Sequence, residues 1–245
     1  MIKTIDHKKM GQGKQGAVDS FFHFSFADYC NPKNTNFGIL RVMNDDIVKP
    51  NTGFGPHPHE NMEIISYVVD GELSHKDSMG NERALTRGQV QYMSAGTGVV
   101  HSEMNHSKEP LRFFQIWIFP DKKGYTPNYG DFRFKLEDRY DAWLAMATSV
   151  ENKDNAAPIK IHADINAYAA ILSPGKSLDF EVSPQRQAYL ALIEGDAELQ
   201  GKAGSSGAIF MRDAAEITAE SFTITASSKG PAHALVIEMA RCPAG

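Results

Sequence analysis

The chain has little cysteine, and this excludes two classes of protein. Of its 245 residues only two are cysteines, Cys30 and Cys242, and they form no Cys-x-x-Cys motif. A disulfide framework and a cysteine-rich structural zinc site are therefore both excluded. We expect each thiol to behave as a small buried apolar side chain in a reducing compartment.

Long apolar runs and an excess of basic charge are missing as well. No stretch approaches the roughly 18 uninterrupted apolar residues that a transmembrane helix needs. The N-terminus, MIKTIDHKKMGQGKQGAVDS, has neither the apolar core of a signal peptide nor the composition of a transit peptide, so we expect a cytoplasmic protein without membrane contact. A net charge of -5 argues against direct nucleic-acid binding, because phosphate contacts need clustered Lys and Arg.

Short apolar runs separated by turn sequences dominate the region from residue 37 to residue 120. Their spacing of roughly 8 to 12 residues is typical of an all-β sandwich or barrel. The runs are FGILRVM, MEIISYVV, GNERALT, QVQYM and LRFFQIWIF. The letters NDD after the first run and Asp70-Gly71 after the second are predicted to form turns.

The pattern repeats after a polar interruption. Residues 121–157 are rich in turn formers and predict a linker with one short helical piece, after which strand-like runs resume. We therefore predict two tandem β domains, residues 1–135 and residues 136–245.

The two halves resemble each other weakly. YVVDGELSHKDSMGNERALTRGQVQYMSAG and LALIEGDAELQGKAGSSGAIFMRDAAEITA both contain an apolar strand that ends in acid-Gly, then a hairpin and a further strand. Counting back from Gly195 as His57 and His59 count back from Gly71 leads to Glu181 and Ser183. Only the N-terminal domain is therefore expected to carry the histidine pair.

That histidine pair lies in GFGPHPHENMEI, residues 53–64. Because side chains alternate along a strand, His57 and His59 point to the same side of an extended segment, with Cα atoms about 6.5 Å apart. Pro56 and Pro58 disfavour helical backbone at the preceding residue and favour this extended geometry. Proline also lacks an N–H group, so the segment is expected at a sheet edge or an irregular strand start.

A second pair, His101 and Glu103, follows the Gly-rich turn SAGTG in GTGVVHSEMNH. Two such pairs on neighbouring strands aim three imidazoles and one carboxylate at one cavity. Such a donor set suits a divalent transition metal of the iron, manganese, nickel or copper type and leaves coordination positions open.

Other interpretations remain open at this point. A lone His-x-His is more often a partly exposed strand pair, and the second pair is what favours a metal. Glu63, in the same strand parity as His59, either replaces Glu103 as a ligand or orients an imidazole. His75 and Asp77 also share a strand face but approach a hairpin turn, where we expect exposure to solvent. Neither a nucleophile elbow nor a phosphate loop is present.

The order of several segments resembles the pirin family of bicupin proteins, within the cupin superfamily. These segments are HFSFADY, GILRVMNDD, GFGPHPHENMEIISYVVDGELSHKDSMGN, GQVQYMSAGTGVVHSE and QIWIFP. The resemblance is dense from about residue 20 to residue 130. It implies two cupin, jelly-roll type β-barrel domains that face each other, with a metal only in the N-terminal one. The implied ligands are His57, His59, His101 and Glu103, and Glu63 then supports the site or the fold.

The same resemblance implies a function. Bacterial pirins with a complete ligand set resemble quercetin 2,3-dioxygenases, which open the ring of a flavonol with O2 and release carbon monoxide. The implied cofactor is one divalent transition metal, iron(II) first, with manganese, nickel, copper, cobalt and zinc as alternatives. The expected partners are O2 and a small aromatic, flavonol-like substrate.

Specific residues can be assigned to this chemistry. Glu103 is the expected acceptor of the substrate's hydroxyl proton. Phe54, Met93, Val99 and Phe114 are expected to line the substrate cavity. Two alternatives are a metal- or redox-responsive regulator that acts through protein–protein contacts, and a metal-binding scaffold without turnover.

Overall fold

The computed structural model describes residues 1–241, and regular structure in this part of the chain is almost entirely β. Helical turns occur there only as two short 3-10 segments, η1 (His7–Lys9) and η2 (Leu136–Arg139). None of the helices over this range has the length and apolar character that a membrane span requires. Cys30 is exposed, contrary to the expected burial, and Cys242 lies outside the described residues. The predicted all-β class is confirmed.

The chain divides into two compact units. The N-terminal unit contains residues 10–134 and 159–163; the C-terminal unit contains residues 1–9, 135–158 and the chain from residue 164 onward. The division differs from the predicted ranges, because both termini contribute to the C-terminal unit. Strand β1 (Ile2–Ile5) pairs antiparallel with β20 (Ala214–Thr218), which satisfies the free edge of that strand. A pairing across more than two hundred residues leaves no local signal in the sequence.

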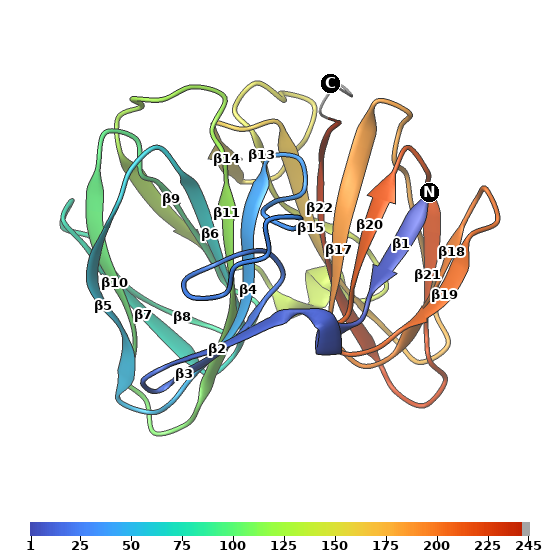
Figure 1. Cartoon of the computed structure of the whole chain (residues 1–245), viewed down its shortest axis with the longest axis horizontal. Helices are drawn as coiled ribbons and strands as arrows, with labels where there is room; N and C mark the ends of the chain where they lie inside the picture. Colours follow the sequence, from blue (N-terminus) through green and yellow to red (C-terminus); the bar gives the residue numbers. More distant parts are fainter. Residues whose placement is uncertain (242–245) are drawn as a thin grey trace. The chain divides into compact units, whose positions relative to one another are not determined.

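The N-terminal unit consists of two sheets that lie face to face (Figure 1). Its strands are β2 (Gly11–Gln15), β3 (Val18–Phe22), β4 (Leu40–Val48), β5 (Thr52–His59), β6 (Glu63–Asp70), β7 (Glu72–Asp77), β8 (Glu82–Thr86), β9 (Val90–Ser94), β10 (Val99–Asn105), β11 (Leu111–Ile118), β12 (Asn128–Phe132) and the short β14 (Ile159–Ile161). One sheet is seven-stranded, in the order β12-β9-β6-β11-β4-β3-β2, and the other is four-stranded, in the order β5-β10-β7-β8. Apolar side chains from both sheets, such as Val68 and Leu73, meet in one core.

The C-terminal unit has a corresponding pair of sheets. Its further strands are β13 (Leu144–Ser149), β15 (Ile165–Leu172), β16 (Ser177–Phe180), β17 (Arg186–Glu194), β18 (Ala197–Gly201), β19 (Ser206–Ile209), β21 (Phe222–Ala226) and β22 (Ala232–Ala240). The larger sheet contains the order β1-β20-β17-β22-β15-β13, and the smaller has the order β16-β21-β18-β19. Side chains such as Leu190 and Leu199 join the two sheets in a continuous apolar core.

The local predictions of turn and linker fail where tertiary contacts supply partners for polar residues. The letters NDD are not a turn: Asn44, Asp45 and Asp46 lie inside β4. On one face Asp45 accepts two hydrogen bonds from Arg112, at 2.8 and 2.7 Å. The predicted linker likewise contains strands β12 and β13, together with the predicted short helical piece at η2.

The strand registers identify which residues of the two units correspond. Gly71 and Gly195 both have a positive φ, and each lies close to a proline carbonyl. A Cβ on Gly71 would collide with Pro110 O, and a Cβ on Gly195 with Pro231 O. Six residues after each glycine, Asp77 lies opposite His101 and Gly201 lies opposite Phe222.

These registers correct the counterpart predicted for His57. His57 lies opposite His101, whereas Phe180 lies opposite Phe222. Phe180, rather than Glu181, therefore occupies the position of His57, because the chain from this position to the glycine is one residue longer in the C-terminal unit. The Phe180 and Phe222 rings stack 5.4 Å apart within the apolar core. Apolar packing thus replaces imidazoles at these two positions of the C-terminal barrel.

Candidate metal centre

The first two histidines of the site lie on an edge strand. β5 forms one edge of its four-stranded sheet and includes both Pro56 and Pro58, as the missing proline N–H groups predict. His57 and His59 project from the same face of this strand, and their ring centroids are 4.8 Å apart. The edge position thus allows a proline-stiffened segment without loss of ladder hydrogen bonds.

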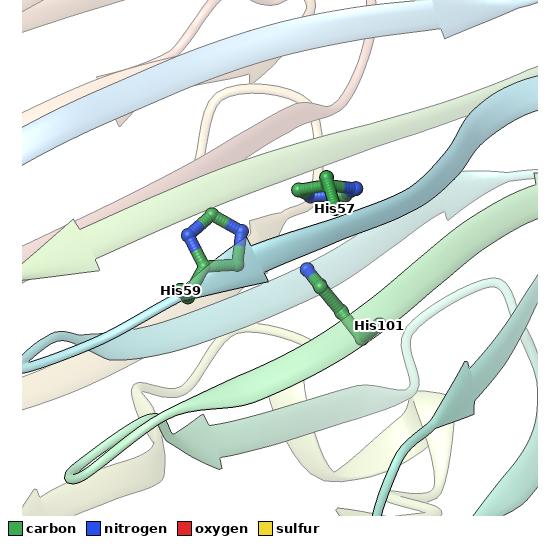
Figure 2. A group of neighbouring side chains, drawn as sticks. All are labelled: His57, His59 and His101. Carbon is green, nitrogen blue, oxygen red and sulfur yellow. The ribbon is translucent and has the colours of Figure 1, made fainter.

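The third histidine comes from the neighbouring strand. His101 on β10 lies directly opposite His57, with ring centroids 4.5 Å from His57 and 4.9 Å from His59. Figure 2 shows the three rings converging from the two strands, and one ring nitrogen of each lies within 4.8 Å of the others. The turn before β10 requires Gly96, which has a φ of 46° and whose Cβ would lie 1.9 Å from Tyr125 O.

Two of the three imidazoles have a lowered pKa, and the third is oriented by a hydrogen bond to the backbone. Burial lowers the pKa of His101 to about 3 and that of His59 to about 4, with the neighbouring imidazoles adding to the effect. Both rings are therefore neutral at pH 7 and retain a lone pair. The Nδ1 of His57 is 2.7 Å from Gly55 O; because a carbonyl only accepts, this nitrogen donates and Nε2 carries the lone pair.

His101 gives the most direct indication of a missing partner. Its side chain is buried, and neither ring nitrogen has a hydrogen-bond partner within residues 1–241. A buried imidazole without any partner is costly, and a metal ion would satisfy one nitrogen. The residues present therefore fit a divalent transition metal.

Glu103 enters the same barrel interior two residues further along β10. Its carboxylate oxygen Oε1 accepts hydrogen bonds from Ser66 Oγ at 2.6 Å and from Gln91 Nε2 at 2.8 Å. A β-bulge in β5 places Glu103 opposite Phe54. One carboxylate oxygen lies within 4.8 Å of ring nitrogens of His101 and His75. The four predicted residues thus belong to two donor groups that share His101.

His75 is the residue of this region that the sequence analysis placed wrongly. Its side chain and that of Asp77 are fully buried, contrary to the expected exposure at a hairpin turn. His75 Nε2 is 3.1 Å from Asp77 Oδ2, and its ring stacks on Tyr129 at 4.3 Å. The turn itself begins only after Asp77, whose other oxygen accepts hydrogen bonds from the backbone of Met79 and Asn81. The i, i+2 spacing of His75 and Asp77 is the sequence feature from which this buried pair could have been predicted.

Glu63 has a structural environment away from the imidazoles. β5 ends at His59 and β6 begins at Glu63, with a turn at Asn61 (φ 50°) between them, so the assumed common strand parity does not hold. The Glu63 carboxylate accepts a hydrogen bond from Ser94 Oγ at 2.7 Å. Burial raises its pKa to about 7, against the opposing effects of Ser94 and of the His162 backbone.

This raised pKa predicts a pH-dependent stability. Because the folded-state pKa lies above the ordinary value of 4.5, stability from the neutral form is present at low pH and is lost as pH rises through about 7. The Glu63→Gln variant has no carboxyl group at this position, so nothing titrates near pH 7 at residue 63. We expect urea unfolding to show that wild type loses up to roughly 3 kcal/mol more than the variant between pH 5 and pH 8. Glu60→Gln, at an exposed position, is the matched control. Parallel pH profiles for wild type and Glu63→Gln would contradict the assignment.

Two cavities border the imidazole group. The first has a volume of about 430 Å³, and its lining includes His57, Phe54, Phe26, Gln115 and Trp117. The second, of about 380 Å³, borders His59 and includes Val99 in its lining. Phe54 and Val99, two of the residues predicted to line a cavity, therefore each border one of these two cavities.

Met93 and Phe114 occupy other positions. Met93 is buried in an apolar cluster with Ile64 and Val99 and lines neither cavity. Phe114 lies on the opposite face of β11 from Gln115 and Trp117, and its ring lies 6.2 Å from that of His23. The prediction of Phe114 as a cavity residue is corrected by strand alternation, because every second residue of β11 faces the barrel interior.

Comparisons with known proteins give the same picture. The Pirin family model matches residues 5–118, and the model described as quercetinase C-terminal cupin domain matches residues 146–239. A pirin-like protein of Caulobacter vibrioides is 40% identical over 201 residues, covering 82% of this chain and 86% of that protein. The chain belongs to the pirin family. The predicted pair of cupin domains agrees with both family models.

Two further relatives of this pirin bear on its chemistry. A protein of Escherichia coli K12 named quercetin 2,3-dioxygenase is 37% identical over 215 residues, covering 87% of this chain and 90% of the relative. The crystal structure of the bacterial pirin YhhW from Escherichia coli in complex with nickel(II) superposes with a TM-score of 0.87 at 31% identity. That match covers 99% of this chain and 100% of YhhW.

Proposed function

We propose that this pirin is a metal-dependent dioxygenase that opens the ring of flavonols such as quercetin with O2 and releases carbon monoxide. The observation that carries the proposal is the group of three converging imidazoles, His57, His59 and His101, beside an apolar cavity of about 430 Å³. Cavities of several hundred Å³ with mainly apolar walls are typical of small-molecule sites. The Escherichia coli relative named quercetin 2,3-dioxygenase supports the same substrate class.

His57, His59, His101 and Glu103 are the residues that would hold the ion. We expect iron(II) first, with manganese, nickel, copper, cobalt and zinc as alternatives, because three nitrogens and one oxygen accept several of these metals. When bound, the ion supplies Lewis-acid activation of a substrate oxygen and a centre for electron transfer to O2.

The protein's own groups bind the flavonol and accept its proton. The aromatic side chains of Phe54, Phe26 and Trp117 provide flat apolar surfaces on the cavity wall. Glu103 is the proton acceptor for the flavonol hydroxyl. Its Oε1 is held by Ser66 and Gln91, so the carboxylate is fixed in orientation before the substrate arrives.

The test is turnover by reconstituted protein. Apoprotein prepared without oxygen is loaded in turn with iron(II), manganese, nickel, copper and cobalt, and quercetin and oxygen are then added. We expect at least one metal form to consume quercetin and oxygen in equal amounts and to release an equal amount of carbon monoxide. Failure of every metal form to do so, with stoichiometric metal bound, would refute the dioxygenase proposal.

A further inference from the structure

Polar atoms without partners gather on one wall of the N-terminal barrel. Neither the Nδ2 nor the Oδ1 of Asn44 has a hydrogen-bond partner in the described chain, although Asn44 is only 1% exposed. The same holds for the Nε1 of Trp117 and the Oδ1 of Asp46. Buried polar atoms are almost always paired in folded proteins, so several unpaired atoms in one place indicate a ligand.

These residues share the barrel-facing side of two adjacent strands. β4 and β11 run side by side in Figure 1, and Asn44 lies directly opposite Gln115. Residues directly opposite each other in a ladder project to the same face. Gln115 and Trp117 line the 430 Å³ cavity, and Gln115 Nε2 also donates to Asp46 Oδ2 at 2.8 Å. Asn44 therefore projects to the same face of the sheet as Gln115, next to the cavity wall.

The Trp117 indole links these unpaired polar atoms to the imidazole group. The Trp117 ring contacts His59 on one side, with centroids 4.7 Å apart, and Phe26 on the other, at 5.3 Å. Both ring pairs are edge-to-face. The cavity that borders Trp117 and Gln115 also borders His57, so a single planar ligand can extend from the imidazoles to these two residues.

The donor and acceptor types select one functional group. The indole N–H of Trp117 only donates, whereas the side-chain oxygen of Asn44 only accepts. A phenolic hydroxyl offers both complementary functions, because its oxygen can accept from Trp117 and its hydrogen can be donated to Asn44. A ring hydrogen satisfies neither atom, and an ether oxygen leaves the Asn44 oxygen unpaired.

We propose that Asn44 and Trp117 determine specificity by binding a phenolic hydroxyl group of the substrate, on a part of the molecule away from the hydroxyl that reaches the imidazoles. The inference rests on the proposed function for the class of compound, the flavonols. It goes beyond that function in assigning the residues that select hydroxylated rings over unsubstituted ones. A site built to bond a substrate hydroxyl rejects analogues without it, because its own polar groups are then left buried and unpaired.

The test compares two ligands in the absence of turnover. Nickel(II)-loaded full-length protein is titrated under argon with quercetin and with 3-hydroxyflavone, which keeps the ring system and the reacting hydroxyl but lacks the other hydroxyl groups. We expect wild type to bind quercetin at least about tenfold more tightly than 3-hydroxyflavone. Asn44→Leu should weaken quercetin binding about tenfold and change 3-hydroxyflavone binding less than about twofold. Trp117→Phe also alters the cavity wall, so it should weaken the binding of both ligands, and that of quercetin by the larger factor.

Two controls separate recognition from a structural role. Trp143→Phe alters the other tryptophan, whose Nε1 donates to Asp179 O in the C-terminal unit, and should leave both affinities unchanged. Asn44→Leu replaces an unpaired buried amide with an apolar group of similar volume, so its melting temperature should equal or exceed that of wild type. A residue needed only for folding would instead lower the melting temperature.

Each outcome bears on the inference separately from the proposed activity. Equal affinity of wild type for the two flavonols, no binding of either, or unchanged selectivity in Asn44→Leu would overturn it. Turnover without hydroxyl selectivity would retain the dioxygenase and reject the role of Asn44 and Trp117. Selective binding without turnover by any metal form would support that role and reject the dioxygenase.

Discussion

Replacing His57 and His101 together by alanine is expected to abolish metal binding while the β fold persists. These two residues face each other across β5 and β10 and supply two of the three imidazoles. Changing a residue that merely orients a ligand costs about 10- to 100-fold in metal affinity, so losing two ligands should cost more than about 1,000-fold. Elemental analysis after reconstitution and desalting measures the bound metal, and far-UV circular dichroism monitors the fold.

A matched control uses a histidine outside the site. His106 follows β10 in the chain and is exposed, so His106→Ala should keep the wild-type metal content. A second double variant, His57→Gln with His101→Gln, preserves polarity should the alanine variant fold poorly. Stoichiometric metal in either double variant after desalting would show that the ion binds elsewhere.

Glu103→Gln is expected to reduce kcat by about 100- to 10,000-fold, the range typical of removing a general base. The substitution keeps the shape of the side chain and removes its ability to take up a proton. The three imidazoles should still bind the metal with reduced affinity, so the rate is measured at saturating metal with quercetin as substrate. KM should change much less than kcat, because the apolar cavity wall is unaltered.

The control for this variant is another glutamate of the same unit. Glu109 is exposed in the turn after β10, and Glu109→Gln should retain full turnover. A Glu103→Gln enzyme that binds metal and keeps its rate within about threefold of wild type would exclude Glu103 as the proton acceptor.

The features of the site that followed from sequence are those with a local physical cause. Strand alternation places His57 and His59 on one face, and the proline N–H rule places them at a sheet edge; β5 has both properties. The turn at Gly96 is equally local, because its φ of 46° favours glycine just before β10 begins at Val99. Such signals depend on a few consecutive residues.

Other features depended on which strands become neighbours. The NDD segment reads as a turn by composition, yet its partners on β11, Arg112 and Gln115, convert it into a strand with an ion pair on one face and a polar cavity wall on the other. His75 was expected at an exposed turn, but Asp77 and Tyr129 enclose it.

The sequence by itself determined the β class, the tandem repetition of the strand pattern and the residues that can ligate a metal, because periodicity, proline and side-chain chemistry act over short distances. Only the tertiary structure decided that β1 completes the C-terminal unit, that Phe180 is the counterpart of His57, and that Asn44 lies opposite Gln115 of the cavity wall. Pairing between distant strands is selected by the packing of whole sheets, and no short stretch of residues encodes it.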